Sequence, residues 1–537
     1  IGALVFSSPY FFAGHYQFSI EREEHVCNSN SSNSSCPLNE SRRTSLSDYK
    51  YVFFFGQFLH GAGAAPLFTL GLTYLEESVP TKMTSLYMGI FYTMSLVGPG
   101  MGYMLGGQLL QTYVDWDIDA KELGLTPSSN VWVGAWWIGF LIGAAFGLFI
   151  AIPLLAFPKT LPGTNQLKKV SEMHKNLQKS KVAEKDFGRS VKDMPKSFLY
   201  LIKNPTFMFL NLAGASEGML ISALATFSPK IIEQQFSLQT STAALIVGLI
   251  SLPGAGGGTF LGGYIVKNKK CAPIIKFCII CTIIALFLTL AFVISCPNLK
   301  FAGVTSPYPY ETQLRDSSDI QMESPCNSNC SCSQKDYNPI CGLNNQMFFS
   351  PCHAGCETSV HFGESRAYLN CKCLRGLNYS EMISWKDKTH KLENGSYVLL
   401  DAVREKCTSD CHLLPFFLVM IFLCLVFTFL VSIPSLTATL RCVADSQKSF
   451  ALGIYIFDIA LYYGFNTSSI NYTGIQWIGV RVLGTIPAPL IFGSLIDMSC
   501  MLWQNSCDGS GACLVYNNRQ MNRNVLSLAV TLKIISL

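Results

Sequence analysis

The sequence predicts an all-α polytopic membrane protein that carries a small disulfide-rich module outside the membrane. Charged residues make up only 14% of the chain and its mean hydropathy is +0.31, whereas an average soluble domain has roughly 25% charged residues. Long apolar runs alternate with polar segments along the chain. Many of the 21 cysteines gather in one polar segment, which indicates an oxidising compartment.

The apolar runs are long enough to cross a bilayer as helices. We expect ten membrane segments, the first and the last incomplete, because the chain begins at Ile1 and ends within an apolar run, as a piece cut from a longer protein would. In chain order these segments are Ile1–Phe12, Tyr51–Tyr74, Leu86–Leu110, 131–157, Phe207–Phe227, Ala243–Val266, Ile274–Ile294, Pro415–Leu436, Ile475–Ile496 and Leu526–Leu537.

The charges of the connecting segments orient these helices. Residues 159–204 are strongly basic, and Lys267–Lys270 forms a second basic turn. Both fall on the same side as Lys82, which the positive-inside rule makes cytoplasmic. The predicted division is an N-terminal bundle (1–158), a basic cytoplasmic linker (159–204), the start of a C-terminal bundle (205–297), an extracellular module (320–411) and the rest of that bundle (413–537).

The segment 131–157 has no charged side chain and begins with three tryptophans. Tryptophan favours the membrane interface, and Gly134, Gly139, Gly143 and Gly147 would allow a neighbouring helix to approach one face closely. An ordinary tryptophan-anchored membrane helix explains these features as well. The stretch nevertheless resembles the signature of the organic anion transporting polypeptides, through Trp132, Gly134, Ala135, Trp136, Trp137 and Gly139.

The resemblance covers essentially the whole chain and is nearest to the fourth and the gonad-enriched sixth subfamilies. It implies a major-facilitator bundle of two six-helix halves that lacks its first two helices and part of the third. It also implies sodium-independent uptake or exchange of bulky amphipathic organic anions at the plasma membrane, such as steroid conjugates, bile-acid-like compounds, thyroid hormones or prostaglandins. No cofactor is implied, and the oligomeric state stays open.

The sequence departs from the family pattern at several positions. Ser128–Val131 lack the acid and the arginine that normally precede the signature tryptophan. Tyr10 stands where many members have a histidine. Residues 454–474 interrupt a segment that is continuous in the family; its two sequons, at Asn466 and Asn471, are either chance matches in an inserted loop or signs of an extra re-entrant segment.

The cysteine-rich segment is better explained by disulfides than by zinc. Its cysteine spacing lacks a regular Cys-x2-Cys pair, and only two histidines, His353 and His361, lie nearby. We expect five disulfides among Cys326, Cys330, Cys332, Cys341, Cys352, Cys356, Cys371, Cys373, Cys407 and Cys411. External sequons, and therefore predicted glycosylation sites, are Asn30, Asn33, Asn39, Asn329, Asn378 and Asn394. Cys341–Cys352 resembles the core of a Kazal-type module, with an exposed loop at Ser333–Ile340.

Charges within apolar runs are candidates for function because the membrane interior penalises them. Arg481 resembles the family arginine that faces the central cavity, where a guanidinium can bind a carboxylate or sulfate. Lys276 resembles a family lysine but is equally explained by snorkelling. Glu217 lies deep in its helix and needs a partner or a proton, and His60 is mid-helix. These four are the predicted substrate-binding residues.

No pattern for an enzyme, a metal site or a nucleic-acid surface stands out, and the net charge of +5 is modest. The expected partners are an organic anion and the lipid bilayer. Two rival interpretations remain. In one, the Kazal-like module of a surface protein binds or inhibits a protease or another partner. In the other, the chain derives from a transporter and no longer transports, since His60 and Ala64 replace charged family residues.

Overall fold

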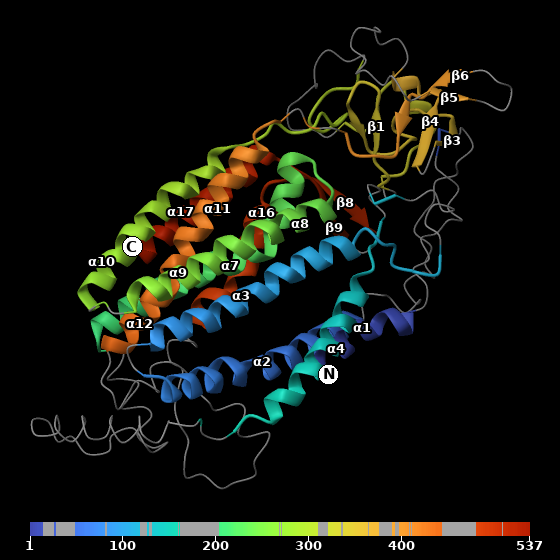
Figure 1. The fold of residues 1–537 in the computed structure, drawn as a ribbon. Coiled ribbons are helices and arrows are strands. Elements are labelled where there is room, and N and C mark those ends of the chain that lie inside the picture. The colour runs from blue at the N-terminus through green and yellow to red at the C-terminus, as the bar shows by residue number, and fades with distance from the viewer. Residues whose placement is uncertain are drawn as a thin grey trace, which may run out of the picture.

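A computed structural model gives the architecture of the chain (Figure 1). It describes residues 1–13, 26–27, 49–80, 83–118, 126–127, 132–158, 161, 203–267, 269, 271–309, 321–334, 337–362, 365–374, 389–391, 397–407, 409, 411–442, 480–506 and 509–537. The sequons at Asn30, Asn33, Asn39, Asn378 and Asn394, nearly all of the predicted linker and the whole of 454–474 lie outside these residues.

Helices follow each of the ten apolar runs within the described residues. They are α1 (Gly2–Ala13), α2 (Lys50–Ser78), α3 (Thr84–Leu109), α4 (Trp136–Leu155), α7 (Pro205–Phe236), α8 (Thr240–Ser251) with η4 (Leu252–Gly256) and α9 (Gly257–Val266), α10 (Cys271–Leu288) with η5 (Thr289–Val293), α11 (Leu414–Leu430) with α12 (Ser432–Cys442), η10 (Val480–Thr485) with α16 (Pro487–Asp497), and α17 (Asn518–Ser536). Six of these segments are long and apolar enough to cross a membrane. The chain is therefore a mostly helical, multi-pass membrane protein.

Two helices extend furthest beyond the spans that the sequence predicts. The α7 helix continues nine residues past Phe227 and through Pro229, ending at Phe236. The α17 helix begins at Asn518, inside the segment expected to be an external turn, because the side chain of Asn517 accepts a hydrogen bond from the Gln520 amide. The polar turns at the end of α7 and at the start of α17 lower the local hydropathy, so hydropathy does not reveal these extensions.

Glycines let α3 pack closely against the second part of the chain. A Cβ at Gly107 would press on Leu245 of α8, one at Gly100 on Leu252 of η4, and Gly89 meets Gly263 of α9. The α9 helix uses Gly258 in the same way against Val426 of α11. Small residues therefore allow α3, η4, α9 and α11 to pack closely, as expected for apolar helices whose association relies on close contact.

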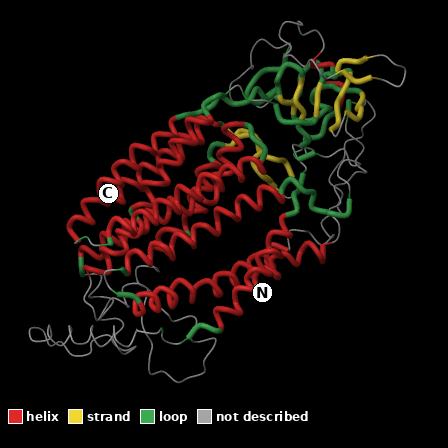
Figure 2. The backbone as a smooth tube through the Cα atoms, viewed as in Figure 1, coloured by secondary structure: helices red, strands yellow, loops and turns green. Residues whose placement is uncertain are grey.

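The helices α1, α2 and α4 form a separate layer beside α3 (Figures 1 and 2). Aromatic rings hold it together: Phe6 of α1 contacts Phe53 of α2 at 4.8 Å and Phe140 of α4 at 4.2 Å between ring centroids. Gly143 and Gly147 of α4 have nothing within 4 Å of where a Cβ would be. The predicted glycine contact face of this helix therefore does not extend to these two residues within the described part of the chain.

A disulfide-rich module, the described residues from Leu299 to Cys407, lies at one end of the bundle (Figure 1). Its five-stranded antiparallel sheet has the order β2-β1-β7-β4-β3. The strands of the module are β1 (Ile340–Gly342), β2 (Met347–Phe348), β3 (Thr358–Phe362), β4 (Ser365–Leu369), β5 (Thr389–Lys391), β6 (Tyr397–Leu399) and β7 (Ala402–Val403). Phe301, Val304 and Tyr308 belong to its core, so it packs from an earlier residue than the predicted start at 320.

The module is docked on the outer end of the second helical part. The hairpin of β8 (Cys500–Ser506) and β9 (Gly509–Tyr516) connects α16 to α17, and its Leu502 joins the module core. Lys406 of the module forms an ion pair with Glu233 of α7 at 2.7 Å. These contacts come from three distant parts of the sequence, so the module is fixed to the bundle at several points.

The predicted exposed loop at Ser333–Ile340 is only partly exposed. Its second half packs inward: the Tyr337 ring lies 5.2 Å from that of Phe349, and the Asn338 side chain accepts a hydrogen bond from Arg404. Ile340 is fully buried. A protease-inhibiting loop must present its residues to the enzyme. The expectation of an exposed loop is wrong for Pro339 and Ile340, which are buried, and Tyr337 and Asn338 are half-buried.

Candidate functional site

Arg481 lies in η10, a short π-helical segment that opens the span ending at Asp497. The Ile486 amide donates to the Arg481 carbonyl at 2.9 Å, five residues back. Segments of this kind are frequent at functional sites because they widen a helix and displace its side chains. Pro487 and Pro489 follow directly, so the segment combines a cation with a local break in regular helix geometry.

Small residues bring η10 against α7. A Cβ at Gly484 would overlap the Ala215 carbonyl, and one at Gly218 would lie 2.9 Å from the Val480 side chain. The Ser222 hydroxyl adds a hydrogen bond to the Thr485 carbonyl at 3.2 Å. The backbone carrying Arg481 is therefore fixed at the level of residues 214–222 of α7.

The α3 helix approaches the same region from the first part of the chain. Arg481 is exposed in this structure and interacts electrostatically with Tyr92 of α3. Further along α3, the Tyr103 hydroxyl donates a hydrogen bond to the Ala225 carbonyl of α7. Side chains of α3 thus extend toward Arg481 at Tyr92 and toward α7 at Tyr103.

Glu217 has a cationic partner that sequence reasoning missed. Both oxygens of its carboxylate accept hydrogen bonds from Lys533 of α17, at 2.7 and 3.0 Å. The lysine also donates to the Thr428 hydroxyl of α11 at 2.9 Å. All three N–H donors of the ammonium are therefore satisfied. Only 1% of the Lys533 side chain is exposed, against 19% for Glu217, so the pair opens toward solvent on the glutamate side.

A signal for Lys533 was present in the sequence. It is the one charged residue in the apolar run Leu526–Leu537, and the rule that singles out Arg481 applies to it equally. Glu217 itself was predicted to need a partner or a proton, and the structure supplies a partner from a helix more than 300 residues away. The pair joins α7, α11 and α17 in the middle of the bundle.

The other two predicted substrate residues lie elsewhere. Lys276 is exposed on α10, five residues after the helix begins. His60 of α2 faces α1, where a Cβ at Gly2 would lie 2.7 Å from its ring. The structure therefore brings Arg481 close to the α7 segment that carries Glu217, while His60 lies in the separate layer of α1, α2 and α4.

The signature residues form a structured corner rather than a helix start at 131. Gly134 forms an isolated bridge with Tyr113, and a Cβ there would overlap Leu110. The Trp132 and Trp137 indole N–H groups donate to the carbonyls of Leu110 and Val114, at 2.7 and 3.1 Å. The α4 helix begins only at Trp136, because residues 132–135 first return along the end of α3.

All ten cysteines of the predicted set form disulfides, which excludes the zinc interpretation for them. Four bonds lie within the set, and they are Cys326–Cys373, Cys332–Cys352, Cys341–Cys407 and Cys356–Cys371. The expectation of five bonds closed within the set is wrong. Cys411 pairs with Cys296 at the base of the module, and Cys330 pairs with Cys27. No group of histidine, cysteine and acidic residues in the described ranges could hold a metal.

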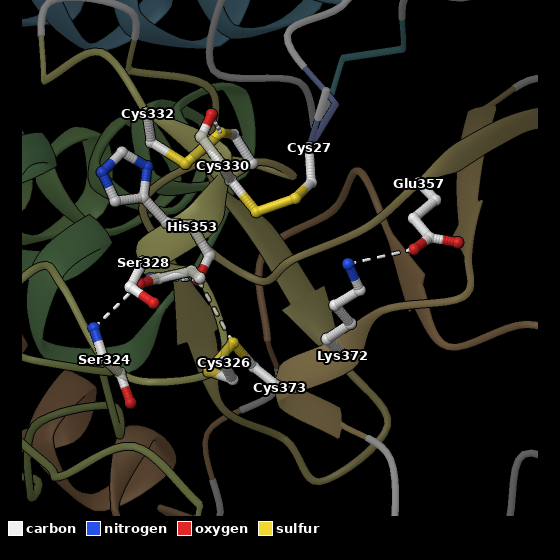
Figure 3. The surroundings of a disulfide bond; sticks show 12 residues. Cys27, Ser324, Cys326, Ser328, Cys330, Cys332, His353, Glu357, Lys372 and Cys373 are labelled. Carbon is white, nitrogen blue, oxygen red and sulfur yellow. Dashed lines mark hydrogen bonds and ion pairs between the residues drawn. A yellow bond between two sulfur atoms is a disulfide. The ribbon is translucent and has the colours of Figure 1, made fainter. Parts of the chain in front are cut away.

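The Cys27–Cys330 bond links the segment between α1 and α2 to the module (Figure 3). The contact is more than covalent, because the Cys27 amide donates to the Cys356 carbonyl at 2.8 Å and Val26 packs against the module core. The Lys372–Glu357 ion pair lies nearby at 3.2 Å. The first part of the chain is thereby bonded to the module seated on the second.

Comparison with known proteins agrees with this architecture. A profile of the Organic Anion Transporter Polypeptide (OATP) family matches residues 1–465 and 469–521. The match covers all but residues 466–468 of the predicted insertion 454–474, so the family comparison does not support an insertion of that length. Mouse solute carrier organic anion transporter family member 4A1 is 40% identical over 547 residues, which cover 100% of this chain and 69% of the relative.

Two human members of the same family are also similar to this chain. Solute carrier organic anion transporter family member 4C1 is 39% identical across 100% of this chain and 69% of its own length. Member 6A1 is 31% identical across 88% of this chain and 61% of its own. The family match over nearly the whole chain, together with the signature corner at Trp132–Gly139, shows that this protein belongs to the organic anion transporting polypeptide family of solute carriers.

Proposed function

We propose that this protein carries bulky amphipathic organic anions across the plasma membrane without sodium, by alternating access between two six-helix halves of the major-facilitator type. The substrate class comprises steroid conjugates, bile-acid-like compounds, thyroid hormones and prostaglandins. Family membership supports the general role in organic anion transport. The observation that carries the proposal for this chain is Arg481, a cation on a π-helical segment that packs against α7 and lies within electrostatic reach of Tyr92 of α3.

Arg481 would hold the anionic group of the substrate. A guanidinium presents paired N–H donors that match the two oxygens of a carboxylate or sulfate, and such bonds strengthen where water is scarce. Tyr92 and Tyr103 of α3 would contact the apolar scaffold and contribute hydroxyl groups. The binding place then lies between elements of the two halves, as is usual for transporters built from structural repeats.

The two π-helical segments would accommodate the movement between halves. The η4 segment interrupts the long helix from Thr240 to Val266 at Pro253, and η10 interrupts the span of Arg481. The η4 segment packs against Gly100 of α3 in the N-terminal bundle, and η10 packs through Gly484 against α7 within the C-terminal bundle. Irregular backbone in a membrane helix is tolerated where protein covers it or where it lines a cavity, which fits a hinge beside the substrate.

The module would act as a structural cap of Kazal-like type on the outer face. Asn329, the one predicted glycosylation site of the module that lies among the described residues, is exposed there, as a glycan requires. Packing of residues 337–340 against the module's own core argues for this role over protease inhibition.

Uptake of a radiolabelled sulfated steroid into cells that express the full chain tests the proposal. We expect uptake to persist when choline replaces sodium. We expect Arg481→Gln to raise KM by about tenfold or more, the equivalent of one charge-assisted hydrogen bond, and Arg481→Lys to lose less. Arg519→Gln, an exposed arginine at the start of α17, is the matched control. Unchanged uptake by Arg481→Gln at equal surface expression would reject this placement of the anion.

A further inference from the structure

The Glu217–Lys533 pair lies on α7, the helix that packs against the segment carrying Arg481. Gly214 and Gly218, which flank Glu217 on α7, both contact Val480, the residue before Arg481. Glu217 turns instead toward α17, on the helix face where Leu220 and Leu224 pack against Leu528 and Leu532. The Glu217 carboxylate and the η10 segment that carries Arg481 therefore lie at the same level of α7, on different faces of that helix.

An unpaired carboxylate at this level would oppose anion binding. In a medium of low dielectric its charge would act on Arg481 and on the substrate with little screening. It would either compete with the substrate for the guanidinium or repel the substrate directly. Lys533 removes this effect, because its ammonium contacts both carboxylate oxygens and is itself fully enclosed.

The geometry of Lys533 favours a fixed neutralising charge over a mobile one. Its third donor is bound to Thr428 of α11, so three helices hold the ammonium in place. The carboxylate is the more accessible member of the pair. The buried ammonium can therefore influence a bound substrate only by neutralising the charge of Glu217.

We propose that Lys533 is a positioning residue of the anion site, which neutralises Glu217 so that this carboxylate does not oppose the binding of an anion at Arg481. This inference rests on the proposed function. The net charge of Glu217, Lys533 and Arg481 is +1, and the removal of either member of the pair changes it in opposite directions. Lys533→Met makes it zero, and Glu217→Gln makes it +2.

Transport kinetics of these variants test the inference, with one steroid carrying a single sulfate and one carrying a sulfate and a carboxylate. We expect Lys533→Met to raise KM by about tenfold for the dianion and by less for the monoanion. Glu217→Gln should lower KM for both. The double variant Glu217→Gln/Lys533→Met should return KM to within about twofold of wild type, and Lys533→Arg should preserve it. Arg519→Met on the same helix is the control.

Other outcomes separate a structural role from an electrostatic one. If the pair only joins helices, both single variants lower the amount of folded protein and Vmax while KM stays the same for both steroids, and the inference is overturned. Should Lys533→Met fail to reach the surface, the KM of Glu217→Gln decides, since a pure loss of helix contact cannot tighten anion binding. Absence of uptake by the wild type removes the proposed function and this inference together.

Discussion

The disulfide-rich module and the helical bundle are stabilised by different means. The module has a small sheet and a core of fully buried side chains closed by disulfides, and its buried histidine, His353, carries no charged partner in the described residues. The bundle packs glycine faces and holds a charge pair, Glu217–Lys533, within three helices. A short polar segment needs covalent bonds to fold, whereas apolar helices in a bilayer need close contact and paired charges.

The Cys27–Cys330 disulfide joins the first part of the bundle to the module. Its removal should have an all-or-none effect on whether the two parts of a cut chain stay covalently connected. With a protease site inserted in the sequence 159–204, the cut wild-type chain should run as one species on a non-reducing gel and as two after reduction. Cys27→Ser should give two species without reductant, because its bond is the described link between the fragments. Cys36→Ser is the control, and a cut Cys27→Ser chain that still ran as one species would reveal another cross-link.

Removal of a bond inside the module should cost more stability than any single change in the bundle. The double variant Cys341→Ser/Cys407→Ser opens a loop of 66 residues, and the chain-entropy relation gives a loss of about 4 kcal/mol. We expect the variant to be retained in the cell and to lose protease resistance in the module. Cys278→Ser, which removes a free cysteine of α10, should reach the surface normally. Equal surface levels of the Cys341→Ser/Cys407→Ser and Cys278→Ser variants would contradict the claim that the module depends on its disulfides.

A pair of glycine variants tests whether close contact stabilises the bundle. A Cβ at Gly262 of α9 would overlap the Leu430 carbonyl, whereas Gly143 of α4 has open space around it. Gly262→Ala should therefore destabilise by about 1–3 kcal/mol. Gly143→Ala should stabilise by about 0.5–1 kcal/mol, since alanine is the better helix former. Thermal unfolding in detergent measures both, and shifts of the same sign would refute the assignment of these two faces.

The sequence predicts the bundle better than the module for a physical reason. A membrane helix is determined locally by twenty or so apolar residues, so a helix follows each of the ten predicted segments. The errors lie at the helix ends, most clearly where polar turns extend α7 and α17 and where α4 begins only at Trp136. Disulfide pairing depends on which chains meet in space. Ten cysteines in one segment suggested a closed set, and nothing local indicates that Cys330 pairs with Cys27 or Cys411 with Cys296.

The candidate site shows the same limit at the level of single charges. Arg481 could be found because a cation stands out in an apolar span, and Lys533 could have been found by the same rule. The pairing of Lys533 with Glu217 could not be predicted, because it depends on how α7 and α17 pack. Composition therefore predicts which residues are costly to bury, and only the fold shows which of them neutralise one another.

His353 gives the smallest and most specific test of the comparison. Its side chain is buried, Nδ1 lies 2.8 Å from the Ser350 hydroxyl, and burial lowers its pKa from 6.5 to about 4. The unfolded chain therefore binds a proton before the folded one, so the stabilisation is complete above pH 6.5 and is lost as the pH falls toward 4. At pH 5.5 the loss is about 1.4 kcal/mol.

Protease resistance of the module in the intact chain, compared at pH 7.5 and 5.5 with a protease active at both, measures this loss. The resistance of the wild type should fall at the lower pH. In His353→Gln it should be lower at both values and nearly independent of pH, because an amide does not titrate while it can still bond Ser350. A wild-type module that resists equally at both pH values would show that His353 is protonated inside the fold, and that the module, like the bundle, tolerates a buried charge.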